Sequence, residues 1–271
     1  MPNLLFCDID GTLVRTDGTI SDHVRTLLEQ MAKEDHGFIL TSGRPLSSIL
    51  KVRDYIDIDF PHSYIIANNG GLIYDCNAKE PVFEARLPLA LIDKLQTIAE
   101  EMQIHIQTYT ETEIVCRRET EEVQRYAARI KMPVVLSEKL TAPLSVPPYK
   151  MLALSLEGSE TLMPLKRRIE EEFSDTIHPM FSQVGYLELL PKAASKGNAL
   201  HFLCNHLNIP VENTYAAGDS ENDIAMLKAA AVSYAMQNGD ETVKSSAAYI
   251  TALDHNHDGI TEVLEVILAN S

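Results

Sequence analysis

The sequence predicts an α/β protein built on a parallel β-sheet, with an α+β segment inserted into it. Short apolar runs of strand length alternate with helix-like patterns near both ends of the chain. This alternation is interrupted between residues 82 and 185, where the order of helical and strand-like patterns changes. Strands that alternate with helices form parallel sheets with right-handed crossovers. We therefore expect one domain made of residues 1–81 and 186–271, and a second made of residues 82–185.

The segments on either side of the insertion carry the alternating pattern. Before it, the expected elements are a strand at 4–7, a helix at 21–34, a strand at 37–40, a helix at 46–52, a strand at 64–67 and a returning strand at 72–74. After it, they are a strand at 187–190, a helix at 196–207, a strand at 214–217, a helix at 223–229, strands at 232–235 and 249–250, and a closing helix at 260–269.

The inserted segment mixes helices and strands in a less regular order. Helices are expected at 88–102, 119–131 and 159–173, and strands at 104–108, 113–116, 150–156 and 177–181. Pro147 and Pro148 exclude a continuous helix or strand, so residues 143–148 are expected to form a loop.

The composition is that of a folded protein with an acidic surface. Of the 271 residues, 45% are hydrophobic and 23% are charged, which is enough apolar surface for a packed core. The formal net charge of -16 argues against a nucleic acid partner, because a phosphate backbone would be repelled. A phosphorylated ligand would therefore need positive charge supplied locally at its site.

The cysteines and the N-terminus indicate a protein of the cytoplasm. The four cysteines show no CxxC spacing, which fits reduced thiols better than disulfides or a zinc site. The first residues do not combine a basic region with a long apolar stretch, and no segment approaches eighteen uninterrupted apolar residues. We expect no contact with a membrane, and the sequence does not indicate an oligomeric state.

The strongest functional signal is the run Asp8-Ile9-Asp10-Gly11-Thr12 at the end of the first expected strand. Ligands of open α/β sheets collect at the carboxyl ends of such strands. Two carboxylates separated by one residue repel each other, so a nearby cation is expected to balance them. An isolated acidic turn would explain an Asp-x-Asp pair by itself, but Gly11 and Thr12 complete a motif in this context.

Three further polar loops lie at strand ends or helix starts. They are Thr41-Ser42-Gly43-Arg44-Pro45, Ser195-Lys196-Gly197 and Gly218-Asp219-Ser220-Glu221-Asn222-Asp223. Each alone has a plain structural interpretation as a helix cap, a surface lysine or a turn. Their order along the chain is informative, because one edge of a parallel sheet can gather all of them.

These motifs together resemble the haloacid dehalogenase-like phosphotransferases, which share an Asp-x-Asp-Gly-Thr motif. The resemblance spans both ends of the chain, and Asn69-Gly70 with the other loops is similar to the Cof-type subgroup. It implies a Rossmann-like core, an inserted α+β cap of the C2B type that selects the substrate, and Mg²⁺-dependent hydrolysis of a small phosphate ester, with sugar phosphates as the first substrate class. Cofactor phosphates form the second substrate class.

The resemblance also implies roles for individual residues. Asp8 would be the nucleophile that forms an aspartyl-phosphate, and Asp10 the general acid and base. Mg²⁺ would be bound by Asp8, by the backbone carbonyl of Asp10 and by Asp219. The phosphoryl group would be held by Ser42, Gly43, Arg44, Lys196 and Asn222, with Gly11, Thr12 and Asp223 in support.

Several alternatives stay open on the sequence alone. A phosphomutase, a dehalogenase or another phosphotransferase of the family would keep the same fold. A phospho-acceptor signalling module resembling receiver domains also combines acidic residues with Ser/Thr and Lys, but it carries its acceptor after the third strand, where this chain has Asn68-Asn69-Gly70. Dinucleotide binding is disfavoured because no GxGxxG follows the first strand.

The sequence leaves the roles of some residues open. Arg44 serves equally well to hold a substrate or to bridge to an acidic neighbour, and Asn69 suits a hairpin turn. Glu188 could face either domain. The polar loop around residues 254–258 contains two histidines and two aspartates, and a polar turn explains it more simply than a metal site does.

Overall fold

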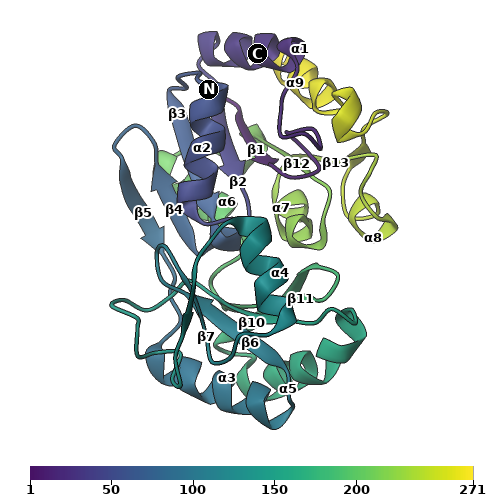
Figure 1. Ribbon diagram of the computed structural model, residues 1–271. Helices are drawn as coiled ribbons and strands as arrows, with labels where there is room; N and C mark the ends of the chain where they lie inside the picture. Colours follow the sequence, from purple (N-terminus) through teal and green to yellow (C-terminus); the bar gives the residue numbers. More distant parts are fainter. Residues whose placement is uncertain (271) are drawn as a thin grey trace. The chain divides into compact units, whose positions relative to one another are not determined.

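A computed structural model describes residues 1–270 of the chain and divides it into two compact units (Figure 1). The first unit consists of Met1–Glu84 and the residues from Ala193 onward, and the second of Ala85–Lys192. Each unit contains its own sheet. The α/β fold with a parallel core sheet and a second, inserted sheet is confirmed.

The first unit contains an eight-stranded sheet in the order β14-β13-β12-β1-β2-β3-β4-β5. Its strands are β1 (Leu4–Asp8), β2 (Gly37–Thr41), β3 (His62–Ala67), β4 (Leu72–Asp75), β5 (Glu80–Glu84), β12 (Thr214–Gly218), β13 (Val232–Ala235) and β14 (Tyr249–Ile250). The strands from β14 to β3 are parallel, whereas β4 and β5 return antiparallel. Strands β1, β2 and β12 are buried throughout, as expected for a sheet covered on both faces.

Helices connect these strands in sequence. They are α1 (Asp22–Lys33), α2 (Leu46–Ile56), α6 (Lys196–Leu207), α7 (Ile224–Ala229), α8 (Glu241–Lys244) and α9 (Ile260–Ala269). Ser21 and Ser195 begin α1 and α6 as N-caps, each accepting a hydrogen bond from a backbone N–H of the first turn. Helices α1 and α9 pack against each other, and α9 also contacts β12.

One face of this sheet is packed by α6 and α7. Leu4 and Phe6 of β1 join an apolar cluster with Leu200 and Leu203 of α6 and Met226 of α7. Alternate residues of a strand share a face, so the side chain that follows Phe6 by two positions points to the same side. The first turn of α6 therefore lies next to the residue that ends β1.

The second unit contains a six-stranded sheet in the order β10-β11-β9-β6-β7-β8. Its elements are α3 (Leu89–Glu101), β6 (His105–Tyr109), β7 (Ile114–Cys116), α4 (Glu121–Ile130), β8 (Val134–Leu136), β9 (Met151–Leu154), α5 (Met163–Phe173), β10 (Ile177–Gln183) and β11 (Tyr186–Pro191). Residues of α3 and α5 share one apolar cluster with one face of the sheet, and α4 shares another with the opposite face. The segment 143–148 contains no helix or strand, as predicted.

The boundaries between the two units, at Glu84/Ala85 and Lys192/Ala193, differ from the predicted boundaries at 81/82 and 185/186. Residues 82–84, assigned to the insertion, belong to β5 and pair with β4 in the first sheet. Residues 186–190, assigned to the core, belong to β11 and pair with β9 and β10 in the second sheet. Short apolar strands suit either sheet, and only their pairing partners decide between them.

Glu188, which had no firm assignment, lies in β11 of the second unit. Its carboxylate accepts a 3.0 Å hydrogen bond from Nζ of Lys150, and both side chains are buried. Among the described residues, none of the helices combines the length and apolar character that crossing a membrane requires.

Candidate active site

Four loops come together at the carboxyl edge of the first sheet. Three of them follow β1, β2 and β12, and the fourth leads into α6. The chain order reverses at β1, since β2 and β3 lie on one side of it and β12 and β13 on the other. Open α/β sheets bind their ligands at such a reversal, so this edge is the candidate active site.

Lys196 lies between two buried aspartates. Its Nζ donates hydrogen bonds of 2.5 Å to Oδ1 of Asp8 and of 2.5 Å to Oδ1 of Asp223. The side chains of Lys196 and Asp223 are fully buried, and Asp8 is 6% exposed. Asp8 follows Phe6 by two positions and so points toward α6, whose first residue is Lys196.

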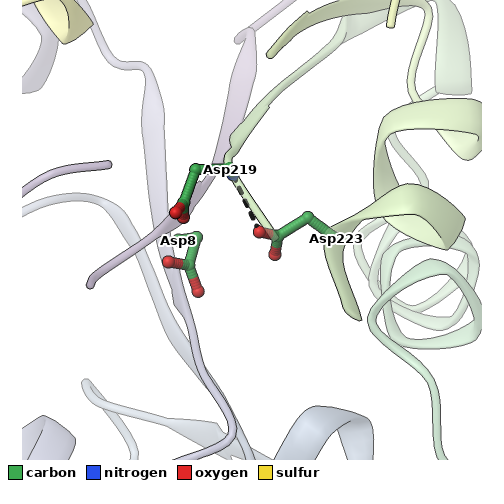
Figure 2. Close-up of side chains that lie close together, drawn as sticks. All are labelled: Asp8, Asp219 and Asp223. Carbon is green, nitrogen blue, oxygen red and sulfur yellow. Dashed lines mark hydrogen bonds between the residues drawn. The ribbon is translucent and has the colours of Figure 1, made fainter. Parts of the chain in front are cut away.

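Asp219 brings a third carboxylate to the same place (Figure 2). One oxygen from each of Asp8, Asp219 and Asp223 lies within 4.8 Å of the others. Asp223 also shapes the loop, because its Oδ2 accepts 3.0 Å hydrogen bonds from the backbone N–H groups of Asp219 and Ser220. The hydroxyls of Thr12 and Ser220 donate to Asp219 at 3.3 and 3.2 Å. Both oxygens of Asp223 are thus engaged within the protein.

Negative charge is in excess at this site, because three carboxylates share one ammonium group. Burial raises the pKa of Asp8 well above its usual range, and the charge of Asp223 raises it further. Burial and the charge of Asp223 also raise the pKa of Asp219 to about 7. Burial alone would lower the pKa of Lys196, but Asp223 and Asp8 outweigh it, so the pKa is raised and the lysine stays charged.

The donor set fits a small divalent cation. Mg²⁺ prefers oxygen ligands, usually one or two carboxylates together with water molecules. Asp8 and Asp219 supply such carboxylates, and a cation there would offset the excess charge. Oδ1 of Asn222 is buried and has no hydrogen-bond partner among the described residues. An acceptor of that kind suits a donor such as a metal-bound water, since buried polar atoms are rarely left unpaired.

The Ser42 loop is tied to the segment that follows β3. The backbone N–H of Ser42 donates to the carbonyl of Ile66 at 2.9 Å, and that of Asn69 donates to the carbonyl of Ser42 at 3.0 Å. The Ser42 hydroxyl accepts a hydrogen bond from the backbone N–H of Arg44 at 3.1 Å. Ser42 is 3% exposed, and Gly43 lies beside it in the same loop. These bonds hold the hydroxyl at a defined position next to the strand ends.

Asp10 lies outside the carboxylate cluster. Nε of Arg44 donates to Oδ2 of Asp10 at 2.7 Å, and a second guanidinium nitrogen donates to Oδ1. The Asp10 side chain is 57% exposed, so this pair contributes little to stability. Of the two roles considered for Arg44, the described contacts show the bridge to an acidic neighbour.

Asn69 and Asn222 connect two of the loops. Nδ2 of Asn222 donates a 2.9 Å hydrogen bond to Oδ1 of Asn69. Asn69 lies in the short 3₁₀ turn Asn68–Gly70 between β3 and β4, so the expected hairpin return is present. Sequence reasoning missed the bridge to Asn222, because the two residues are 153 positions apart.

Two other contacts at this edge were not anticipated. Nδ2 of Asn238 donates to the carbonyl of Gly11 at 2.8 Å, which fastens the loop after β1. Arg15 pairs with Asp258 at 2.8 Å, so the 254–258 loop serves to anchor the same segment. Within residues 1–270, only the cluster of Asp8, Asp219 and Asp223 has the geometry of a carboxylate metal site.

The sequence matches the family described as haloacid dehalogenase-like hydrolase over residues 5–264. The chain belongs to this family. A relative from Streptococcus pyogenes, provisionally named a phosphatase, is 25% identical over 98% of each chain. Another from Buchnera aphidicola, with the same provisional name, is 26% identical over 98% of this chain and 97% of its own.

Solved structures agree with the assignment to the haloacid dehalogenase-like hydrolases. A hydrolase of this kind from Bacteroides thetaiotaomicron has a TM-score of 0.84 and 29% identity, covering 98% of this chain and 100% of its own. A sugar phosphatase of subclass IIB has a TM-score of 0.80 and 22% identity, covering 97% and 98%. The latter likeness shows that this hydrolase shares the fold of that subclass.

Gly11→Ala is expected to weaken binding of a divalent cation to this hydrolase. Gly11 has φ of +80°, and an added Cβ would lie 2.4 Å from Oδ2 of Asp219. Gly18→Ala is the matched control, since Gly18 has φ of +81° but no atom within 4 Å of its added Cβ. Calorimetric titration with Mg²⁺ should show a dissociation constant about tenfold higher than that of the parent for Gly11→Ala, and an unchanged one for Gly18→Ala. Equal affinities in the two variants would contradict the placement of Asp219 at the cation site.

The metal-free hydrolase is expected to lose stability as the pH rises. Since the pKa of Asp219 is about 7 in the folded protein and 3.8 is its ordinary value, the folded state binds the proton more tightly. The stabilisation is complete below pH 4 and is lost as the pH rises through 7. Urea unfolding between pH 4 and 8 in the presence of a chelator measures the free energy of unfolding, with Asp219→Asn as the control. The raised pKa would be contradicted if the free energy of unfolding changed with pH equally in the wild type and in Asp219→Asn.

Proposed function

We propose that this hydrolase is a Mg²⁺-dependent phosphatase that cleaves a small phosphate monoester through an aspartyl-phosphate on Asp8. The observation that carries the proposal is the cluster of Asp8, Asp219 and Asp223 around Lys196 at the chain reversal of the sheet. A carboxylate attacks a phosphoryl group only where positive charge offsets their repulsion. Lys196 supplies one such charge, and Mg²⁺, which would be held by Asp8, the backbone carbonyl of Asp10 and Asp219, would supply more.

Asp8 and Asp10 divide the chemistry between them. An oxygen of Asp8 forms a bond to phosphorus as the bond from phosphorus to the ester oxygen breaks, and Asp10 gives its proton to that oxygen. A water molecule then attacks phosphorus and passes a proton to Asp10 while the bond between phosphorus and the Asp8 oxygen breaks. This step releases phosphate and restores the Asp8 carboxylate. Asp10 is two residues from Asp8 and half exposed, which suits exchange of protons with solvent.

Ser42, Lys196 and Arg44 prepare the site for the phosphoryl group. Ser42 offers a hydroxyl and Gly43 a backbone amide to the phosphoryl oxygens, in a loop held by bonds to the segment after β3. Lys196 stays charged because two aspartates surround it. Arg44 pairs with Asp10, and a phosphoryl oxygen would compete for the same guanidinium.

The second unit is proposed to act as the cap that selects the substrate. It has its own sheet and its own apolar core, so its surface can vary without disturbing the catalytic residues, which all lie in the first unit. Sugar phosphates are the first substrate class to test, since a protein of the same fold is named a sugar phosphatase. Cofactor phosphates are the second. Measuring phosphate release from a panel of sugar phosphates and cofactor phosphates ranks the two classes.

A phosphomutase is the main alternative. It would use the same nucleophile and would return the phosphoryl group to a second oxygen of the substrate instead of to water. The half-exposed Asp10 favours transfer to water. A phospho-acceptor module is disfavoured, because β3 ends at Ala67 and is followed by Asn68-Asn69-Gly70 without an acidic acceptor.

Asp8→Asn is expected to lower the hydrolysis of an aryl phosphate in Mg²⁺ by on the order of 10⁴-fold, because the amide is a poor nucleophile. Asp59→Asn is the matched control, since the Asp59 side chain is almost fully exposed and its carboxylate pairs with Arg53. The control should hydrolyse the aryl phosphate at the rate of the parent. A chelator should abolish hydrolysis by both proteins. Undiminished turnover in a folded Asp8→Asn variant would remove Asp8 from the reaction.

A further inference from the structure

The turn Asn68–Gly70 contacts three of the four loops that form the site. On one side, backbone hydrogen bonds join it to the Ser42 loop, from Asn68 to the carbonyl of Arg44 and from Asn69 to the carbonyl of Ser42, each 3.0 Å long. On another, a Cβ added to Gly70, where φ is +93°, would lie 2.3 Å from the carbonyl oxygen of Ser195. The turn is thus packed directly against the residue that precedes Lys196.

The side chain of Asn69 supplies the third connection. Its Oδ1 accepts the 2.9 Å hydrogen bond from Nδ2 of Asn222, in the loop that carries Asp219 and Asp223. Asn69 has no exposed surface and a left-handed backbone with φ of +55°. A buried amide needs hydrogen-bond partners, and at that φ glycine is favoured, although asparagine adopts the conformation more readily than most residues. An asparagine here is therefore explained better by its contacts than by the turn, which glycine would serve equally well.

The hydrogen bond to Asn69 decides how the amide group of Asn222 is oriented. An amide side chain presents oxygen on one side and NH₂ on the other, and rotation by half a turn exchanges them. With Nδ2 of Asn222 donating to Asn69, Oδ1 is the atom left as an acceptor. That atom is buried and has no hydrogen-bond partner among residues 1–270. Without Asn69, the Asn222 amide is free to turn and to present donors in place of this acceptor.

We propose that Asn69 is a positioning residue that orients Asn222 so that its Oδ1 accepts a hydrogen bond from a Mg²⁺-bound water. This rests on the proposed function for its metal site, and it adds the 68–70 turn to the parts of the chain that the site requires. Asn69 touches neither the metal nor the substrate in this proposal. It acts through Asn222 and through its backbone contact with Ser42.

Asn69→Gly tests the role of the amide without straining the backbone, since glycine adopts the left-handed conformation freely. We expect the Mg²⁺ dissociation constant, measured by calorimetric titration, to rise about tenfold, as is usual when a group that supports metal ligands is removed. The kcat on an aryl phosphate should fall by a similar factor with KM little changed. Asn208→Gly is the matched control, because Asn208 follows the last residue of α6 with φ of +53° and lies twelve residues beyond Lys196. This variant should bind Mg²⁺ as the parent does.

A double-variant cycle shows whether Asn69 acts through Asn222. In an Asn222→Ala background, Asn69→Gly should change Mg²⁺ affinity by less than about twofold, because the oriented amide is already lost. If Asn69→Gly still raised the Mg²⁺ dissociation constant tenfold in the Asn222→Ala background, the two residues would act independently and the coupling would be overturned. Parent-like Mg²⁺ affinity and kcat in Asn69→Gly would overturn the proposal as a whole.

The binding measurement separates this proposal from the proposed function. If the parent binds Mg²⁺ but hydrolyses no phosphate ester, and Asn69→Gly still weakens binding, the phosphatase function fails and the positioning role stands. If the parent binds no Mg²⁺, the positioning role is overturned together with the metal site. Thermal unfolding of Asn69→Gly and Asn208→Gly confirms that both variants are folded before binding is compared.

Discussion

The structure depends on the burial of one lysine among three aspartates. Lys196 and Asp223 are fully buried and Asp8 nearly so, and charges removed from water are costly unless partners surround them. Two short hydrogen bonds from Lys196 meet part of this requirement, but the carboxylates still exceed the ammonium group. The raised pKa values of Asp8 and Asp219 express that excess. A divalent cation would relieve this excess of negative charge, and the electrostatic imbalance is therefore the basis of the proposed metal site.

The fold meets this constraint by bringing distant segments to one sheet edge. Asp8 ends β1, Asp219 follows β12, and Lys196 opens the helix that packs on the face to which Asp8 points. Parallel strands deliver their carboxyl ends together, so the loops converge without long connections. Hydrogen bonds from Asp223 to two backbone amides then hold the Asp219 loop in shape. The turn at 68–70 adds contacts that fix the loops relative to one another.

Much of this arrangement could be predicted from the sequence, because local patterns place the polar loops at strand ends. The roles that depend on pairing between distant residues could not. The sequence did not reveal that the carboxylate of Asp10 lies with Arg44 while that of Asp223 joins the cluster, since in both cases the partners are distant in the chain. Nor did it assign residues 82–84 and 186–190 to the right sheets. Asn69 looked like a turn residue because its partner is far away in the chain.

The central claim is that Asp8 carries the phosphoryl group during turnover. The most direct measurement is mass spectrometry of the hydrolase quenched in acid within milliseconds of mixing with a phosphate ester and Mg²⁺, followed by peptide mapping. The account predicts a transient gain of one phosphoryl group on the peptide that contains Asp8. A phosphoryl group found on a different residue, or steady hydrolysis with no phosphorylated protein at any time, would contradict it.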